Sequence, residues 1–183
     1  MISNEEIRTK LLEKGASILE KEGVSAILER DWKGFVSITG GLELLPLVKP
    51  LWEELREYHS KIANEFSDSI RKRSFSDRVA DFEEKIPNHI FRIELIKVVD
   101  ISPPIGVSIS SLSNNLVGEV ESLFIEETYR GLNIGDLLMI NALNWMDEQN
   151  CRIKKIGVMA GNDVLKFYEK YGFKVRTLML QQV

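Results

Sequence analysis

Residues 123–135 have types and a spacing that suit the binding of an anion. Their sequence is Leu-Phe-Ile-Glu-Glu-Thr-Tyr-Arg-Gly-Leu-Asn-Ile-Gly, in which a predicted strand passes through a short glycine-containing loop into a predicted amphipathic helix. The first amide groups of a helix have no partner within the helix, and they lie at the positive end of its dipole. Arg130 adds charged donors beside them, and Gly131 and Gly135 let a ligand approach the backbone closely. This junction therefore predicts a phosphate or pyrophosphate site.

The same junction is also compatible with a tight turn that binds no ligand. It is not a Walker loop, because no Gly-Lys-Ser/Thr follows the glycines. It is not the dinucleotide-binding fingerprint, because the second glycine and the parallel strand setting of that motif are missing. A second motif is needed to decide between a ligand site and a simple turn.

Residues 161–173 supply that second motif, and the two segments together resemble the GNAT superfamily of N-acetyltransferases. The family carries Arg/Gln-x-x-Gly-x-Gly/Ala at the start of a helix, which residues 130–135 match as Arg-Gly-Leu-Asn-Ile-Gly. Residues 161–173 are similar to its Asn-then-Phe-Tyr-x-x-x-Gly-Phe segment, with a shorter interval between Asn162 and Tyr168 than is common. Asn133 stands where the family usually has glycine. Because asparagine tolerates a left-handed backbone well, we expect the loop to keep its shape.

The resemblance implies an α/β protein with the GNAT fold and a role for acetyl-CoA as cosubstrate. The fold would be a mostly antiparallel, twisted central sheet that splays in the middle, with helices on both faces. The reaction would be direct attack of a primary amine on acetyl-CoA in a ternary complex, without a covalent enzyme intermediate. A backbone amide near Leu123–Ile125 would donate to the oxyanion. The residues that would bind the cofactor are Leu123, Phe124, Ile125, Arg130, Gly131, Leu132, Asn133, Ile134, Gly135 and Asn162.

An amine acceptor needs a base, because a lysine-like amine with a pKa near 10.4 is almost fully protonated at pH 7. The resemblance favours Glu119 as that base. Glu121 is the second candidate, since strand alternation puts it on the same face. Both are equally compatible with ordinary surface carboxylates. Tyr168 would protonate the departing thiolate, although it also belongs to an apolar stripe typical of core aromatics: Val164, Phe167, Tyr168 and Tyr171.

Composition excludes several other classes of function. The 183 residues include 24 Lys and Arg and 28 Asp and Glu, a formal net charge of −4, which is unusual for a nucleic-acid binder. One cysteine, Cys151, and two histidines, His59 and His89, do not form a cluster with zinc-ligand spacing, so we expect no metal site. We interpret Cys151 as structural and the histidines as ordinary polar positions. Without a signal pattern or a long apolar run, we expect a cytoplasmic protein that does not enter a membrane.

Hydrophobic spacing predicts the elements that position these residues. An N-terminal helical extension would occupy residues 1–33, as a candidate dimer interface, and the GNAT domain residues 34–183. Helices are predicted over about 4–22, 47–65, 75–86, 134–149 and 163–171, and strands around 35–38, 91–95, 105–109, 117–125, 154–160 and 174–180. The basic run Arg71-Lys72-Arg73 is predicted to lie in a polar loop, either solvated or binding phosphate or an acidic substrate.

The identity of the acceptor is not encoded in a motif. In this family resemblance the acceptor is set by the variable region, here residues 45–90, which is mixed in charge. A small-molecule amine and a protein amine are both compatible with the sequence, and so is a longer acyl group. A non-catalytic acyl-CoA-binding regulatory module on the same fold is the alternative to an enzyme.

Overall fold

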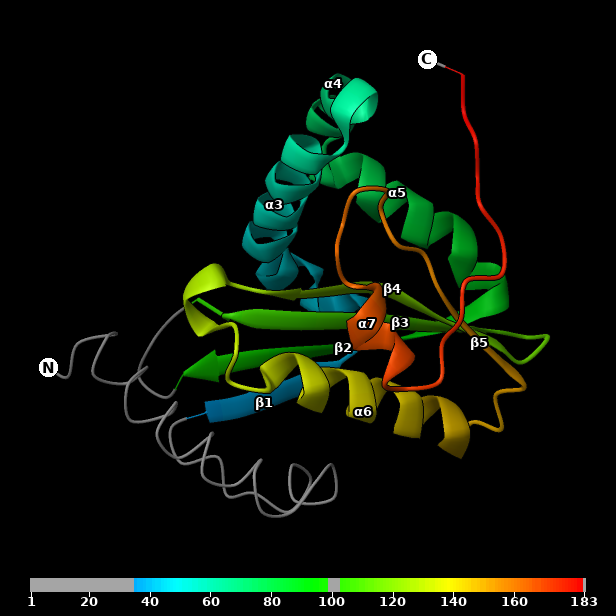
Figure 1. Cartoon of the computed structure of the whole chain (residues 1–183). Coiled ribbons are helices and arrows are strands. Elements are labelled where there is room, and N and C mark those ends of the chain that lie inside the picture. Colours follow the sequence, from blue (N-terminus) through cyan, green and yellow to red (C-terminus); the bar gives the residue numbers. More distant parts are fainter. Residues whose placement is uncertain (1–34, 99–102, 183) are drawn as a thin grey trace, which may run out of the picture.

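The computed structural model describes residues 35–98 and 103–182 (Figure 1). The predicted N-terminal extension, with its candidate dimer interface, lies outside the described residues. Within them, no helix combines the length and the apolar character needed to cross a bilayer.

Five strands form one sheet in the order β1-β2-β3-β4-β5. The first three pairings are antiparallel and the last, between β4 and β5, is parallel. This arrangement confirms the predicted mostly antiparallel sheet. The strands are β1 (Phe35–Gly40), β2 (His89–Val98), β3 (Gly106–Ser113), β4 (Val117–Ile125) and β5 (Ile153–Ile156).

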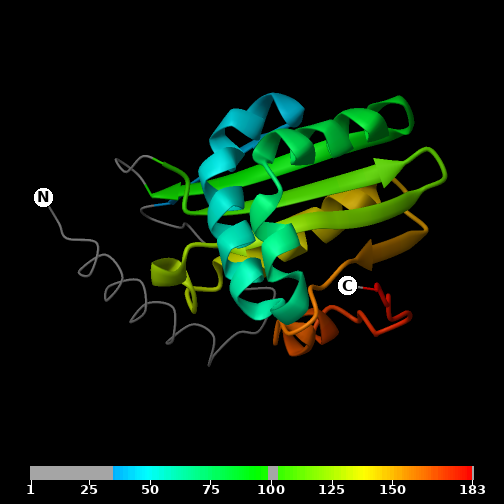
Figure 2. The ribbon, with the colours of Figure 1, turned by 90° about the horizontal axis from the view of Figure 1, so that it is seen from above.

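Helices cover both faces of the sheet, as predicted (Figures 1 and 2). On one face lie α3 (Leu45–Ile62), α4 (Ser67–Lys72) and α5 (Phe75–Lys85), and on the other lies α6 (Ile134–Glu148). The short α7 (Leu165–Glu169) follows β5. Single 3₁₀ turns connect several of these elements: η1 (Leu42–Leu44), η2 (Asn64–Phe66), η3 (Ile86–Asn88) and η4 (Glu127–Tyr129).

The core forms where the apolar stripes of the helices meet the sheet. On the α3–α5 face, Leu51 and Phe82 pack against Ile93 and Ile109 of the two central antiparallel strands, and all four are buried. The start of α5 is fixed by a capping box: the Ser74 hydroxyl accepts from the amide of Asp77, and the Asp77 carboxylate accepts from the amide of Ser74. These contacts pack α3 and α5 against β2 and β3.

A bulge at Glu121 divides β4 into two parts. Ile109 of β3 pairs with Ser122 and the next residue, Ser110, pairs with Val120, so Glu121 is the extra residue on β4. Before the bulge, β4 pairs with β5 through Val117–Val120. After it, β4 continues to Ile125 without β5 beside it. This divergence of β4 from β5 is the predicted splay of the sheet.

Three sequence predictions differ from the structure. The strand predicted over 174–180 does not form: residues 174–182 have no regular structure, and Leu178 and Met179 are 80% and 93% exposed. Apolar residues favour a strand, but a strand also needs hydrogen bonds to a neighbouring strand, and among the described residues the edge strand β5 pairs with β4 alone. The predicted loop around the basic run is also wrong in part, because Arg71 and Lys72 form the last turn of α4. In addition, β5 ends at Ile156 rather than near residue 160.

Candidate active site

A cavity of about 570 Å³ lies where β4 and β5 diverge. Its walls come from α3, from α4 and α5, from β4 starting at Val120, from the loop before α6 and the first turn of α6, and from the segment that runs from the end of β5 into α7. Of the predicted cofactor-binding residues, all line this cavity except Leu132, which is buried in the core beside Ile134 and Leu138. Of the predicted catalytic residues, Glu121 and Tyr168 line it, whereas Glu119 does not.

The loop that enters α6 has the shape expected from its sequence. Asn133 is the N-cap residue and is left-handed, with φ 62° and ψ 14°, which confirms that asparagine keeps the loop conformation in place of glycine. Gly131 has φ 79°, a conformation that favours glycine. No side chain caps the first amides of α6, and the Asn133 side-chain nitrogen is buried without a partner among the described residues. These donors are free to meet an anion.

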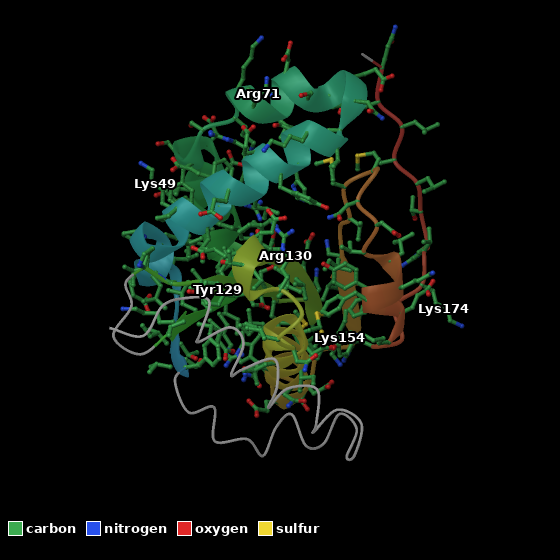
Figure 3. All side chains as sticks on the ribbon, turned by 60° about the vertical axis from the view of Figure 1, so that its left-hand side comes forward. Lys49, Arg71, Tyr129, Arg130, Lys154 and Lys174 are labelled. Carbon is green, nitrogen blue, oxygen red and sulfur yellow. The ribbon has the colours of Figure 1, made fainter. Side chains whose placement is uncertain are left out.

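Arg130 is held beside this loop by its own neighbours. Its Nε donates to the carbonyl of Ile125 at 3.0 Å, and its guanidinium lies 5.4 Å from the ring centre of Tyr58 and 5.5 Å from that of Phe124. Figure 3 shows it between α3 and α6. No hydrogen bond within the described part of the chain uses its two terminal nitrogens, so both can bind a ligand.

Tyr168 lines the cavity and keeps its hydroxyl protonated. Burial raises the pKa of Tyr168 to about 12, so the phenol keeps its proton at every physiological pH. The ring packs edge-on against Phe167 at 5.2 Å and lies 6.3 Å from Phe173. Its hydroxyl makes no hydrogen bond with the described residues. Tyr168 is thus a packed aromatic whose hydroxyl has no acceptor among the described residues.

The two candidate carboxylates have different surroundings. Glu121, whose side chain is 4% exposed, accepts from Lys85 and from the Ser111 hydroxyl at 2.7 Å, and pairs with Arg78 at 3.4 Å. Burial alone would raise the pKa of Glu121, but these hydrogen bonds and charges outweigh burial and lower it. Glu119 pairs with Lys155 at 2.8 Å and with Lys85 at 3.8 Å, away from the cavity lining. Contact with Lys85 shows that the two carboxylates share a face of β4.

Glu121→Gln is expected to lower the free energy of unfolding by about 1–3 kcal/mol at pH 7, because Arg78 and Lys85 then lose their buried partner. The figure lies below the value for a fully buried pair because Lys85 is 31% exposed. Because folding lowers the pKa of Glu121, its contribution is complete above the unfolded pKa and is lost as pH falls through the folded pKa.

Urea unfolding at pH 7 and at pH 3.5 measures this difference. Glu119→Gln is the matched control, and we expect it to change the free energy of unfolding by less than about 0.5 kcal/mol, since its ion pairs are more exposed. Equal losses in the two variants would show that the buried Glu121 network adds no more stability than the more exposed ion pairs of Glu119.

Sequence reasoning missed the contribution of α3 to the cavity. Trp52, Arg56 and His59 lie on one stripe of this helix, at spacings of four and three residues, and all three line the cavity. Burial lowers the pKa of His59, so its imidazole is neutral at pH 7. The Tyr58 hydroxyl donates to the Asn162 side-chain oxygen at 3.2 Å and joins α3 to the segment after β5. The stripe itself is visible in the sequence, but its orientation toward the cavity is not.

Comparison with known protein families identifies the family of this chain. Residues 51–173, more than half of the chain, match the model of the Acetyltransferase (GNAT) family. The chain belongs to this family. GNAT enzymes take an acetyl group from acetyl-CoA, so the protein is an acetyltransferase with acetyl-CoA as its cosubstrate. No curated protein sequence matches the chain.

Solved GNAT structures share the fold at low sequence identity. PaiA N-acetyltransferase of Thermoplasma acidophilum, in complex with coenzyme A, is 20% identical, with a TM-score of 0.59 over 78% of this chain and 91% of that one. A GCN5-related N-acetyltransferase of Ralstonia eutropha is 14% identical, with a TM-score of 0.55 over 82% and 99%. AAC(6')-Iy, in complex with the bisubstrate analogue CoA-S-monomethyl-acetylneamine, is 16% identical, with a TM-score of 0.54 over 81% and 98%.

The cavity residues fit coenzyme A as a ligand. The uncapped amides of α6, the unpartnered Asn133 nitrogen and the terminal nitrogens of Arg130 are donors for a pyrophosphate. Gly135 faces the cavity, where a larger side chain would occupy space beside the first amides. Toward the splay, the backbone of β4 beyond the bulge has no β5 neighbour, which leaves room for an extended chain between the strands.

Proposed function

We propose that this GNAT enzyme acetylates a primary amine of a small molecule by direct attack within a ternary complex. One observation carries the proposal: the uncapped start of α6 and Tyr168 line the same cavity. Donors for a pyrophosphate and a donor for a sulfur atom are thereby available to one ligand. The bisubstrate analogue bound to AAC(6')-Iy, which joins CoA to an amine-derived acceptor, supports a small-molecule acceptor held beside the cofactor.

The proposed cofactor site follows the path of β4 into α6. Residues 130–135 bind the pyrophosphate through backbone amides and Arg130, and Asn162 binds from the opposite wall. Leu123, Phe124 and Ile125 follow the bulge, and backbone amides in this segment that point away from β3 are available to the carbonyl oxygen of the thioester. We include β1 in the catalytic domain, because it belongs to the same sheet, so the domain begins near residue 34.

Tyr168 acts on the sulfur in this proposal. The amine nitrogen forms a bond with the acetyl carbon, the bond from that carbon to sulfur breaks, and one proton leaves the nitrogen while one reaches the sulfur. A phenol with a pKa of about 12 keeps its proton until the thiolate develops and then stabilises it by hydrogen bonding. The pKa of the phenol also prevents Tyr168 from acting as the base.

The surroundings support His59 over either carboxylate as acceptor of the amine proton. Glu121 lines the cavity, but Lys85, Ser111 and Arg78 lower its pKa, which makes its carboxylate a weaker proton acceptor. Glu119 is outside the cavity lining. His59 lines the cavity, is neutral at pH 7, and makes no hydrogen bond with the described residues. We therefore propose His59 as the base and keep Glu119 and Glu121 as the competing predictions.

His59→Gln tests this assignment through pH dependence. The ratio of wild-type to variant kcat/KM is expected to be about 10- to 100-fold above pH 6.5 and to fall toward one as pH decreases through the lowered pKa of His59. Taking the ratio cancels the protonation of the amine itself. Glu119→Gln is the control. If the ratio of wild-type to variant kcat/KM varies with pH only for Glu119→Gln, Glu119 is the base and His59 is not.

The proposed function is tested by two linked measurements. Acetyl-CoA is expected to raise the melting temperature, and release of CoA thiol is then followed with a panel of primary amines. Release of CoA thiol that requires the presence of one of these amines supports the proposal. Stabilisation by acetyl-CoA without release for any small amine or peptide amine would instead identify a non-catalytic acyl-CoA-binding module.

A further inference from the structure

Three arginines line the part of the cavity next to α3 and α5. Arg56 belongs to α3, Arg73 immediately precedes the capping residue of α5, and Arg78 belongs to α5. They lie on different elements from Arg130, which belongs to the loop before α6. The cavity therefore has a second group of cations besides the one proposed for the pyrophosphate.

Arg56 is the member of this group that has no carboxylate partner. Its Nε is buried and makes no hydrogen bond within the described residues. One terminal nitrogen donates to the carbonyl of Arg73 at 3.0 Å, and the guanidinium lies 5.5 Å from the ring centre of Trp52. No ion pair of Arg56 occurs in the described part of the chain. A buried guanidinium nitrogen without an acceptor is costly, and a ligand oxygen would satisfy it.

The neighbouring carboxylates do not neutralise the group. Arg73 and Arg78 both pair with Asp81, so that two guanidiniums share one carboxylate. Arg78 also contacts Glu121, and Lys85 pairs with the same carboxylate. Within the described residues, the ion pairs of Arg73, Arg78 and the neighbouring Lys85 involve two carboxylates, Asp81 and Glu121, apart from the contact of Lys85 with the more exposed Glu119. This wall is cationic in a chain whose formal net charge is −4.

We infer that the acceptor is an amine that also carries an acidic oxygen group, a carboxylate or a phosphate, bound by Arg56 with Arg73 and Arg78. Guanidinium groups match the planar oxygens of carboxylates and phosphates and bind them with two hydrogen bonds. Trp52 and Ile70 line the same wall and provide apolar contact for the carbon skeleton between the amine and the acid. This inference rests on the proposed function and specifies its substrate class.

The cationic wall also acts on the amine. Nearby positive charges disfavour the ammonium form, so they lower the pKa of the bound amine and increase the fraction that can attack. Arg78 donates to the main-chain carbonyl of Glu121 at 3.1 Å, which places this charge beside the bulge where β4 leaves β5. A polyamine would bring several positive charges against this wall and is the opposite of the expected acceptor.

Matched pairs of acceptors test the inference with the full-length protein. Amino acids are compared with their amides, and glucosamine 6-phosphate with glucosamine, by release of CoA thiol from acetyl-CoA. We expect kcat/KM to be at least about tenfold higher for the acidic member of at least one pair. The first pair reports a carboxylate and the second a phosphate.

Arg56→Gln is expected to lower kcat/KM for the acidic member by about 10- to 100-fold, mainly through KM, and to change it less than about threefold for the neutral member. Arg152→Gln is the matched control, since Arg152 is exposed just before β5 and does not line the cavity. Stabilisation by acetyl-CoA should be retained in both variants.

Each outcome decides one proposal. Preference for neutral amines or for spermidine, or an equal loss for both members of a pair in Arg56→Gln, overturns the acidic acceptor but leaves the acetyltransferase function intact. Binding of acetyl-CoA without thiol release from any acceptor overturns the proposed function and, with it, this inference.

Discussion

Gly135→Val is expected to abolish binding of acetyl-CoA. Position 135 is in the first turn of α6 and lines the cavity, so the added isopropyl group would occupy the space beside the uncapped amides. For the wild type, acetyl-CoA at about 100 times its dissociation constant adds about 2.7 kcal/mol of stability, or about 5–10 °C in melting temperature for a chain of this size. For the variant we expect no increase.

The fold should survive this substitution. A Cβ at Gly135 would lie 3.6 Å from the nearest atom of Phe167, which is an ordinary contact, and valine costs a helix no more than glycine. Asn144→Val, at an exposed position of the same helix, is the matched control and should keep the full stabilisation. An undiminished increase in melting temperature for Gly135→Val would show that the phosphates bind elsewhere.

The local parts of the site could be predicted because they depend on short stretches of sequence. The passage from β4 into α6 is fixed by the glycines, by the tolerance of Asn133 for positive φ, and by the periodicity of the helix that follows. The splay was predicted from family resemblance, and the reason for it in this chain is the extra residue at Glu121. The register of a sheet is set by two paired strands together, so the sequence of one strand alone does not predict a bulge.

The parts that could not be predicted depend on contacts between distant segments. Whether Glu119 or Glu121 reaches the cavity depends on the bulge and on Lys85 and Arg78 from α5, more than 30 residues earlier in the chain. The orientation of the α3 stripe depends on the packing of its opposite side against the sheet. The apolar residues near the C-terminus predicted a strand, but a local pattern does not report whether the segment pairs with the edge strand β5.

Tyr168→Phe is expected to lower kcat by about 100-fold, equivalent to about 2.7 kcal/mol of transition-state stabilisation, with little change in affinity for acetyl-CoA. The ring remains, so its packing against Phe167 and Phe173 is kept and only the hydroxyl is lost. Because burial raises the pKa of this hydroxyl to about 12, the wild-type rate should show no decline from its ionisation up to about pH 10.

Tyr171→Phe separates a catalytic hydroxyl from a structural one. Tyr171 packs against the same Phe167, but its hydroxyl donates to Asp136, and it does not line the cavity. Its removal should lower the melting temperature, since Asp136 then keeps only Lys170 at 2.6 Å, while kcat changes less than about threefold. Steady-state kinetics should therefore detect the loss in Tyr168→Phe, whereas thermal melts should detect the loss in Tyr171→Phe. If Tyr168→Phe lowers stability and leaves kcat unchanged, the sulfur receives its proton from water or from another group, and Tyr168 serves the fold alone.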